Sequence, residues 1–172
     1  MYSDLRSSFL LLAAAVLLAF ITTSNAFAQR GASGSVGLAA SMQGEQLDIA
    51  MPIWLSDGFV LAPALGLVMA EDLGTTFSVA AAGRFYWRKS VVCPYAGLRI
   101  GAFLSSPDEG ESTTDILAGP MIGGEVFLHE EFSVGVEGQL NFIFSDDLSL
   151  RFGNPGKMTI STGSAVFATF YF

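Results

Sequence analysis

Five charged residues lie in stretches of the chain that otherwise carry apolar or small side chains, and they are the first candidates for chemistry. They are Asp48, Arg84, Arg99, Glu125 and Glu137. Two carboxylates such as Glu125 and Glu137 can serve as the acid and the base of a hydrolase. Two arginines accompany them, and an unpaired charge in an apolar interior is costly. The residues therefore favour a network of arginine–carboxylate pairs over a catalytic couple.

The stretches that carry these charges alternate between apolar and polar residues, as a β-strand does when its two faces meet different surroundings. Valine, leucine and phenylalanine take most alternate positions of residues 132–145, with Ser133, Glu137 and Gln139 between them. The same period recurs in residues 34–42, 47–55, 59–70, 77–87, 92–104, 116–128, 132–145 and 159–172. The sequence therefore predicts an all-β protein of eight strands.

The composition is unusual for a soluble domain, with 51% hydrophobic residues, 14% charged residues and a mean hydropathy of +0.51. Soluble proteins carry about 25% charged residues. After Ala28, glycine, serine or charged residues interrupt every apolar stretch, so no spanning helix is expected. Strands closed into a barrel are the other way to satisfy backbone groups within a bilayer.

The N-terminus has the features of a secretory signal peptide. Arg6 precedes an apolar run over residues 9–21, and residues 26–28 (Ala-Phe-Ala) fit a cleavage site with small residues at both ends. An uncleaved membrane anchor is the alternative, but the run is shorter than the ~20 apolar residues that a spanning helix needs. We predict a removed signal peptide at residues 1–28 and a single barrel domain at residues 29–172.

The connections between the predicted strands alternate in length, which indicates an antiparallel up-and-down barrel. Short turns at one rim and longer loops at the other are typical of outer-membrane barrels, which also have an even number of strands. The tight connections are residues 56–58, 88–91 and 129–131, and the longer acidic ones are residues 71–75, 105–115 and 146–158.

Two local features complicate the predicted strands. The turn at residues 56–58 fits a three-residue hairpin loop that pairs Leu55 with Phe59 and holds Gly58 in the left-handed conformation. Some prolines fall within predicted strands, where each removes a backbone donor, and we expect bulges there or strand ends that differ from those given above. These prolines are Pro52, Pro63 and Pro120.

Alternation does not by itself say which face lies outside, because a soluble ligand-binding barrel of eight strands has an apolar lumen. The polar face distinguishes the two cases, since it carries glycine, serine and alanine with few charges. Small residues suit the narrow interior of an eight-stranded barrel. We therefore predict a transmembrane barrel with lipid outside.

In its architecture the chain resembles small bacterial outer-membrane β-barrel proteins of the porin-like family, such as outer-membrane protein X and the transmembrane domain of outer-membrane protein A. The resemblance rests on the leader, the eight alternating segments and the C-terminus with Phe170 and Phe172. It implies a place in the bacterial outer membrane, in contact with lipid and lipopolysaccharide. It also implies that Phe170 and Phe172 form the signal for the barrel-assembly machinery.

The inward positions nearest the tight-turn rim are aromatic, and we expect these side chains to form a floor that blocks the lumen. They are Trp54, Tyr86, Tyr95, Phe127 and Tyr171. The charged residues lie deeper in the lumen, with Asp48 near the other rim. We therefore predict a structural or surface-interaction protein. The alternative is a narrow or gated channel, which the floor and the small lumen of eight strands disfavour.

A third possibility is an enzyme, because eight-stranded outer-membrane barrels include lipid A deacylases and palmitoyl transferases. A deacylase needs a serine beside a histidine base near the outer leaflet. His129, the only histidine, lies in a tight turn at the opposite rim, and the nearby Ser133 faces inward. No catalytic residue is therefore expected, and because metal-ligand spacings and phosphate-binding loops are absent, no cofactor is expected either.

The remaining charges and the single cysteine carry less information. A net charge of −8 with scattered basic residues argues against nucleic acid as a partner. Cys93 has no second cysteine to pair with and is expected to be a small apolar filler. Acidic loop residues could bind divalent cations that bridge lipopolysaccharide, or a surface partner, but without regular ligand spacing we expect solvated loops. They are Asp108, Glu109, Glu111, Asp115, Asp146 and Asp147.

Overall fold

A computed structural model describes residues 33–43, 46–70, 74–87, 90–107 and 110–172. The predicted signal peptide at residues 1–28 lies outside these residues. In the part of the chain that is described, no helix is long and apolar enough to cross a membrane.

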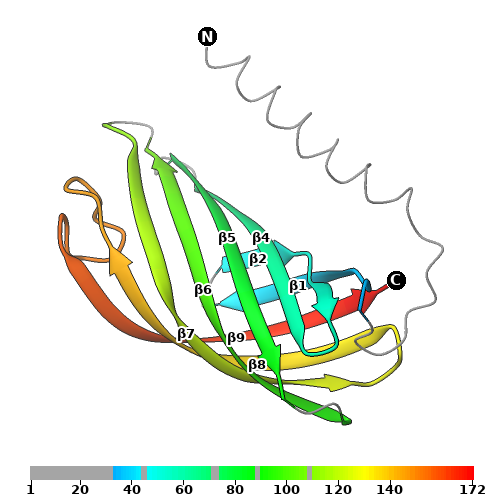
Figure 1. Cartoon of the computed structure of the whole chain (residues 1–172). Coiled ribbons are helices and arrows are strands. Elements are labelled where there is room, and N and C mark those ends of the chain that lie inside the picture. The colour runs from blue at the N-terminus through cyan, green and yellow to red at the C-terminus, as the bar shows by residue number, and fades with distance from the viewer. Residues whose placement is uncertain (1–32, 44–45, 71–73, 88–89, 108–109) are drawn as a thin grey trace.

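The described chain forms one antiparallel sheet that closes on itself (Figure 1). The order of the strands is β2-β1-β9-β8-β7-β6-β5-β4-β3, and a further pairing of β2 with β4 closes the ring. The strands are β1 (Gly37–Gln43), β2 (Gln46–Ala50), β3 (Ile53–Ser56), β4 (Phe59–Ala70), β5 (Gly74–Tyr86), β6 (Val92–Ser106), β7 (Thr113–Phe127), β8 (Phe132–Phe144) and β9 (Met158–Tyr171).

β2 and β3 are two halves of one stave of the barrel. Both pair with β4, through Ile49↔Leu65 in β2 and Ile53↔Leu61 in β3. The stave breaks at Pro52, which has no backbone N–H to donate. The barrel therefore has eight staves, and the predicted eight-stranded antiparallel barrel is confirmed.

The bulges predicted at Pro63 and Pro120 are wrong. Pro63 pairs with Ala81 in an uninterrupted register between β4 and β5, and Pro120 likewise pairs with Leu98 between β7 and β6. On the other side of β7 the pairing with β8 lapses at Pro120 and resumes in the same register. A missing donor therefore interrupts the hydrogen bonds without adding a residue to the strand.

The first hairpin turn also differs from the prediction. Ser56 pairs with Phe59 and the register shifts between Trp54 and Ser56, so Leu55 is the extra residue of a bulge. Gly58 is not among the glycines with positive φ. Because the bulge lies inside β3, only two residues, Asp57 and Gly58, remain in the turn itself.

The two faces of the barrel wall have opposite character. Large apolar side chains face outward and are exposed, as at Leu98 (68%), Ile122 (63%) and Val136 (60%). Inward positions hold buried polar or aromatic groups, as at Tyr95 and Glu125, both 0% exposed. This inverted arrangement is what a barrel wall surrounded by lipid requires.

Glycine makes room in the lumen where large side chains cross it. A Cβ added to Gly135 would lie 2.2 Å from Cζ of Phe167 on β9. Gly135 therefore lets the Phe167 ring lie across β8, in the part of the lumen nearest the tight turns.

Candidate functional site

The aromatic floor lies at the tight-turn end of the lumen and consists of Trp54, Tyr86, Tyr95, Phe127 and Tyr171. All are buried, with 0–5% of their surface exposed. The centroid of the Tyr86 ring lies 4.8 Å from that of Trp54 and 5.0 Å from that of Tyr95. The ring centroids of Phe127 and Tyr171 are 5.7 Å apart. Such distances are those of directly packed rings, so these side chains pack together at this end of the lumen.

Four further residues belong to the same buried cluster, namely Val60, Ala62, Cys93 and Phe167. Phe167 and Val60 are buried in the same cluster, 2% and 0% exposed. Cys93 is a buried free cysteine of this cluster, and its Sγ–H donates to the Ser90 carbonyl at 3.0 Å. The signal for all four was their inward parity, which they share with Trp54, Tyr95 and Tyr171.

Glu125 is held within the floor by hydroxyl groups. Tyr86 and Tyr171 donate to its carboxylate at 2.6 Å and 2.9 Å, and Ser133 also donates to it. These residues come from β5, β9 and β8, so the carboxylate on β7 ties together strands from several sides of the barrel. Three hydroxyl donors thus satisfy both oxygens of this fully buried carboxyl group.

Glu137 lies farther along the lumen and pairs with the guanidinium of Arg84, 3.4 Å away. It also accepts from the Tyr95 hydroxyl at 2.8 Å and from the Gln139 amide at 2.7 Å. The Arg84 guanidinium lies 5.1 Å and 4.4 Å from the ring centroids of Tyr95 and Phe167. The buried charge is therefore compensated by a carboxylate and by two aromatic faces.

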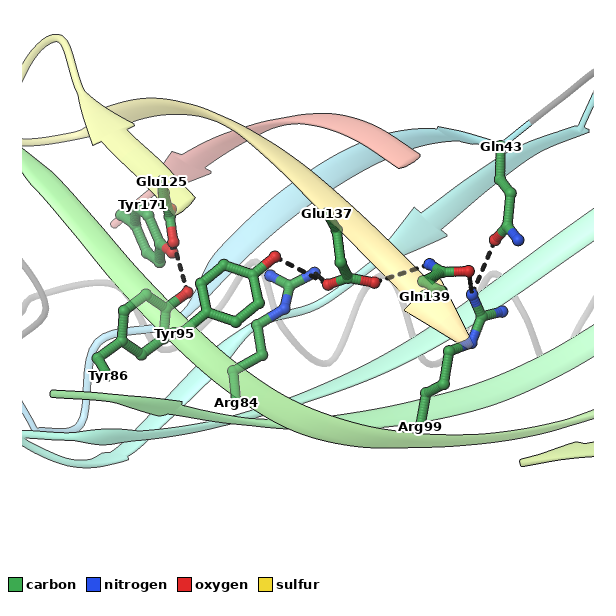
Figure 2. A network of polar contacts seen from close by, with 9 residues as sticks. All are labelled: Gln43, Arg84, Tyr86, Tyr95, Arg99, Glu125, Glu137, Gln139 and Tyr171. Atoms are coloured by element: carbon green, nitrogen blue, oxygen red, sulfur yellow. Dashed lines mark hydrogen bonds and ion pairs between the residues drawn. The ribbon is translucent and has the colours of Figure 1, made fainter. Parts of the chain in front are cut away.

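Arg99 binds amide oxygens where the prediction had carboxylate partners. Its guanidinium donates to Gln43 at 2.8 Å and to Gln139. Gln139 thereby links Arg99 to Glu137, because its amide nitrogen donates to that carboxylate. Figure 2 shows two groups of contacts, one around Glu125 and the other a chain of contacts that runs from Tyr95 and Arg84 through Glu137, Gln139 and Arg99 to Gln43.

Asp48 does not join that chain directly. Its carboxylate accepts from Gln46 at 2.7 Å and from the Ser78 hydroxyl at 3.3 Å. Gly66 on β4 leaves it space, since a Cβ there would lie 2.0 Å from the Asp48 oxygen. Of the five predicted charges, the structure thus joins Arg84 with Glu137 as an ion pair, and binds the other three through neutral side chains.

Asp115 corrects the expectation of a solvated acidic loop. It lies within β7 and is 0% exposed. Its two oxygens accept from the Asp146 N–H at 3.0 Å and from the Ser149 hydroxyl at 2.7 Å. Glu111 is exposed, whereas Asp108 and Glu109 lie outside the described residues. Among the described residues, no group of histidine, cysteine and acidic side chains could hold a metal ion.

The other predicted positions lie at the surface. Phe170 and Phe172 point away from the lumen, 49% and 42% exposed, with ring centroids 6.5 Å apart. His129 is exposed in the turn between β7 and β8, where its Nδ1 accepts the Glu131 N–H at 3.4 Å. The Ser133 hydroxyl points to Glu125, so the structure does not bring His129 and Ser133 together as a nucleophile and its base.

The fold and the lumen together define a class of small eight-stranded outer-membrane-type barrel. No protein-family model matches the chain, and no curated protein matches it by sequence.

Two solved structures share the fold. The N-terminal β-barrel domain of Pseudomonas aeruginosa OprF is 15% identical, with a TM-score of 0.57 over 81% of this chain and 98% of that domain. Neisserial surface protein A (NspA) is 14% identical, with a TM-score of 0.54 over 80% of this chain and 94% of that protein. At these identities the likeness concerns the fold.

Proposed function

We propose that this protein is an integral protein of the bacterial outer membrane with a structural or surface-interaction role, whose lumen does not conduct. The observation that carries the location is the inverted polarity of the wall, with exposed leucine, isoleucine, valine and phenylalanine outside and buried charges inside. The likeness in fold to OprF and NspA supports it.

The location is tested by expressing the full chain and separating the membranes. We expect the protein in the outer-membrane fraction, and we expect the folded barrel to migrate differently from the heated, unfolded chain on a gel. An absence of any heat-dependent shift would contradict a closed membrane barrel.

The closed lumen is proposed from the packing of the aromatic floor. Eight strands leave an interior just wide enough for side chains to fill, and the rings of Trp54, Tyr86 and Tyr95 pack directly on one another there. Beyond them the Arg84–Glu137 pair occupies the lumen. Planar-bilayer recordings test this directly, and a steady large conductance would contradict it.

A narrow or gated channel is the second candidate, and the polar lumen between the floor and the outer rim favours it. Arg99, Gln43 and Gln139 there make hydrogen bonds that water or small ions could replace. Brief, small openings in the same recordings would support this candidate over the closed barrel.

The proposed partners are lipid, lipopolysaccharide, the barrel-assembly machinery and an extracellular surface partner. The exposed rings of Phe170 and Phe172 at the C-terminal strand fit the proposed assembly signal. We propose no enzymatic activity and no cofactor. Mass spectrometry of lipid A from cells with and without the gene tests this, because an acyl chain lost or gained in the deletion strain would indicate a lipid A-modifying enzyme.

A further inference from the structure

The loop between β8 and β9, residues 145–157, has two different faces. It is drawn in orange at the left end of the barrel in Figure 1. Ser149 is buried (3% exposed), whereas Leu148 and Leu150 on either side of it are 59% and 79% exposed. A loop that merely extended into solvent would not alternate in this way, so the segment around Ser149 packs against the barrel through one side.

The first contact of this loop is with Asp115 on β7. The fully buried carboxylate accepts one hydrogen bond from the backbone of Asp146 and one from the side chain of Ser149. A carboxylate buried at this depth needs such donors to offset the loss of its hydration. The loop therefore supplies the hydrogen-bond donors that the buried Asp115 carboxylate needs.

The second contact is made by Arg151. Its guanidinium donates to the Gln46 side chain on β2 at 3.1 Å and lies 4.6 Å from the ring centroid of Phe103 on β6. Phe152 adds an edge-on ring contact with Phe103 at 5.6 Å. Gln46 in turn donates to Asp48 and Ser78, so the loop meets the polar residues of the outer lumen.

The positions of these contacts around the barrel show how the loop runs. In the closed order of strands, β7 and β2 are separated by four steps in either direction, when β2 and β3 are counted as one stave. They are therefore on opposite sides of the lumen. A single loop that touches Asp115 on β7 and Gln46 on β2 must cross the outer mouth.

We infer that residues 145–157 form a lid, seated on Asp115 and Gln46, that closes the outer mouth and keeps small solutes away from Asp48 and Ser78. The lid would make the polar part of the lumen a compartment between two closures, the aromatic floor and the loop. This goes beyond the proposed function and does not depend on whether the floor conducts.

Thiol labelling from the outside tests the lid. Ser78→Cys, in a chain that also carries Cys93→Ala, places the only thiol beneath the lid. The folded barrel in lipid vesicles is treated with a small methanethiosulfonate reagent, and the modification rate is followed by mass spectrometry. A second chain adds Ser149→Ala and Arg151→Ala, which remove one contact from each side of the mouth. A third chain instead adds Leu150→Ala, in the same loop but facing outward. Heat-dependent gel migration checks that all three fold.

Slow labelling under the native loop is expected, with an increase of roughly tenfold or more in the Ser149→Ala/Arg151→Ala chain, because removing hydrogen bonds to charged groups favours local opening of the loop. The Leu150→Ala chain should label at the native rate. Equal rates in all three folded chains, whether fast or slow, would overturn the lid. So would an increase with Leu150→Ala as large as that of the double substitution.

Discussion

The two closures proposed for the lumen are built in different ways. At the tight-turn end, residues of the strands themselves fill the interior, with Trp54, Tyr95 and Tyr171 no more than 2% exposed. At the outer end, a loop crosses the mouth and is held by a few polar contacts from Asp115 and Gln46. The first closure cannot move without opening the barrel wall, whereas the second can open while the wall stays intact.

Because of this difference, changes at the two ends should affect different properties, namely the stability of the whole barrel and the access of solutes to its lumen. A change in the floor or the charges behind it should alter the free energy of unfolding of the whole barrel. A change in the lid should leave that free energy almost unchanged and alter only local opening.

The largest effect is expected from Glu137→Ala. It leaves the buried Arg84 without its carboxylate and removes the acceptor of Tyr95 and Gln139. Breaking a buried pair on one side costs about 3–5 kcal/mol, measurable by urea unfolding of the barrel in lipid vesicles. Arg84→Met together with Glu137→Leu should recover most of the loss. A loss below about 1 kcal/mol, the range of an exposed pair, would show that the interior is well hydrated.

Tyr171→Ala and Phe172→Ala compare the inside and the outside of one strand end. Tyr171 packs on Phe127 and donates to Glu125, so its removal leaves a cavity in the floor and costs about 3 kcal/mol, as for other large aromatic residues. We expect this variant to assemble and to leak in bilayer recordings. Phe172→Ala should lower the amount of assembled barrel without a leak. If both variants only failed to assemble, the separate role of Tyr171 in the floor would lose its support.

Gly135→Ala tests the packing of the floor with a single added methyl group. The new Cβ would lie 2.2–2.7 Å from atoms of the Phe167 ring, so we expect a loss of about 1–3 kcal/mol in the same unfolding experiment. Gly138→Ala is the matched control on β8, because its Cβ would meet only the Ile122 carbonyl at 3.9 Å. Similar losses for both variants would mean that β-strand propensity, and not the floor, determines the effect.

The inward positions of the buried aromatic residues could be predicted because these residues are in strands. Strand parity places Trp54, Tyr86 and Phe127 on one face, and the positions of the tight turns place them at one rim. Both follow from the period of two and from turn composition, so no knowledge of distant contacts was needed.

The partners of the charged residues could not be predicted in the same way. Arg99 reaches Gln43, which lies 56 positions away in the sequence, across the lumen. Which groups meet there depends on the stagger of the strands around the closed barrel and on side-chain conformation, and alternation specifies neither. The same reasoning explains why the ion pair of Arg84 with Glu137 was predicted only as part of a general network.

The contacts that hold the lid could not be predicted from the sequence for a different reason. Asp115 has the inward parity of Leu117 and Met121, but its polar neighbours in sequence indicate an acidic loop. β7 begins at Thr113, so the residue belongs to the wall. The contacts of Ser149 and Arg151 arise from the course of a loop, which has no period from which to predict them.

The smallest effect on global stability is expected from Arg151→Ala. The side chain is exposed, and its contacts with Gln46 and Phe103 at the surface should contribute no more than about 1 kcal/mol to unfolding. Hydrogen exchange followed by mass spectrometry should nevertheless show faster exchange in residues 145–157, because the Asp146 N–H is protected only while it is bonded to Asp115. Leu150→Ala should leave exchange in this segment unchanged. If Arg151→Ala instead lowered global stability as much as Glu137→Ala, the outer closure would be part of the same cooperative unit as the floor, and the contrast between the two ends of the lumen would not hold.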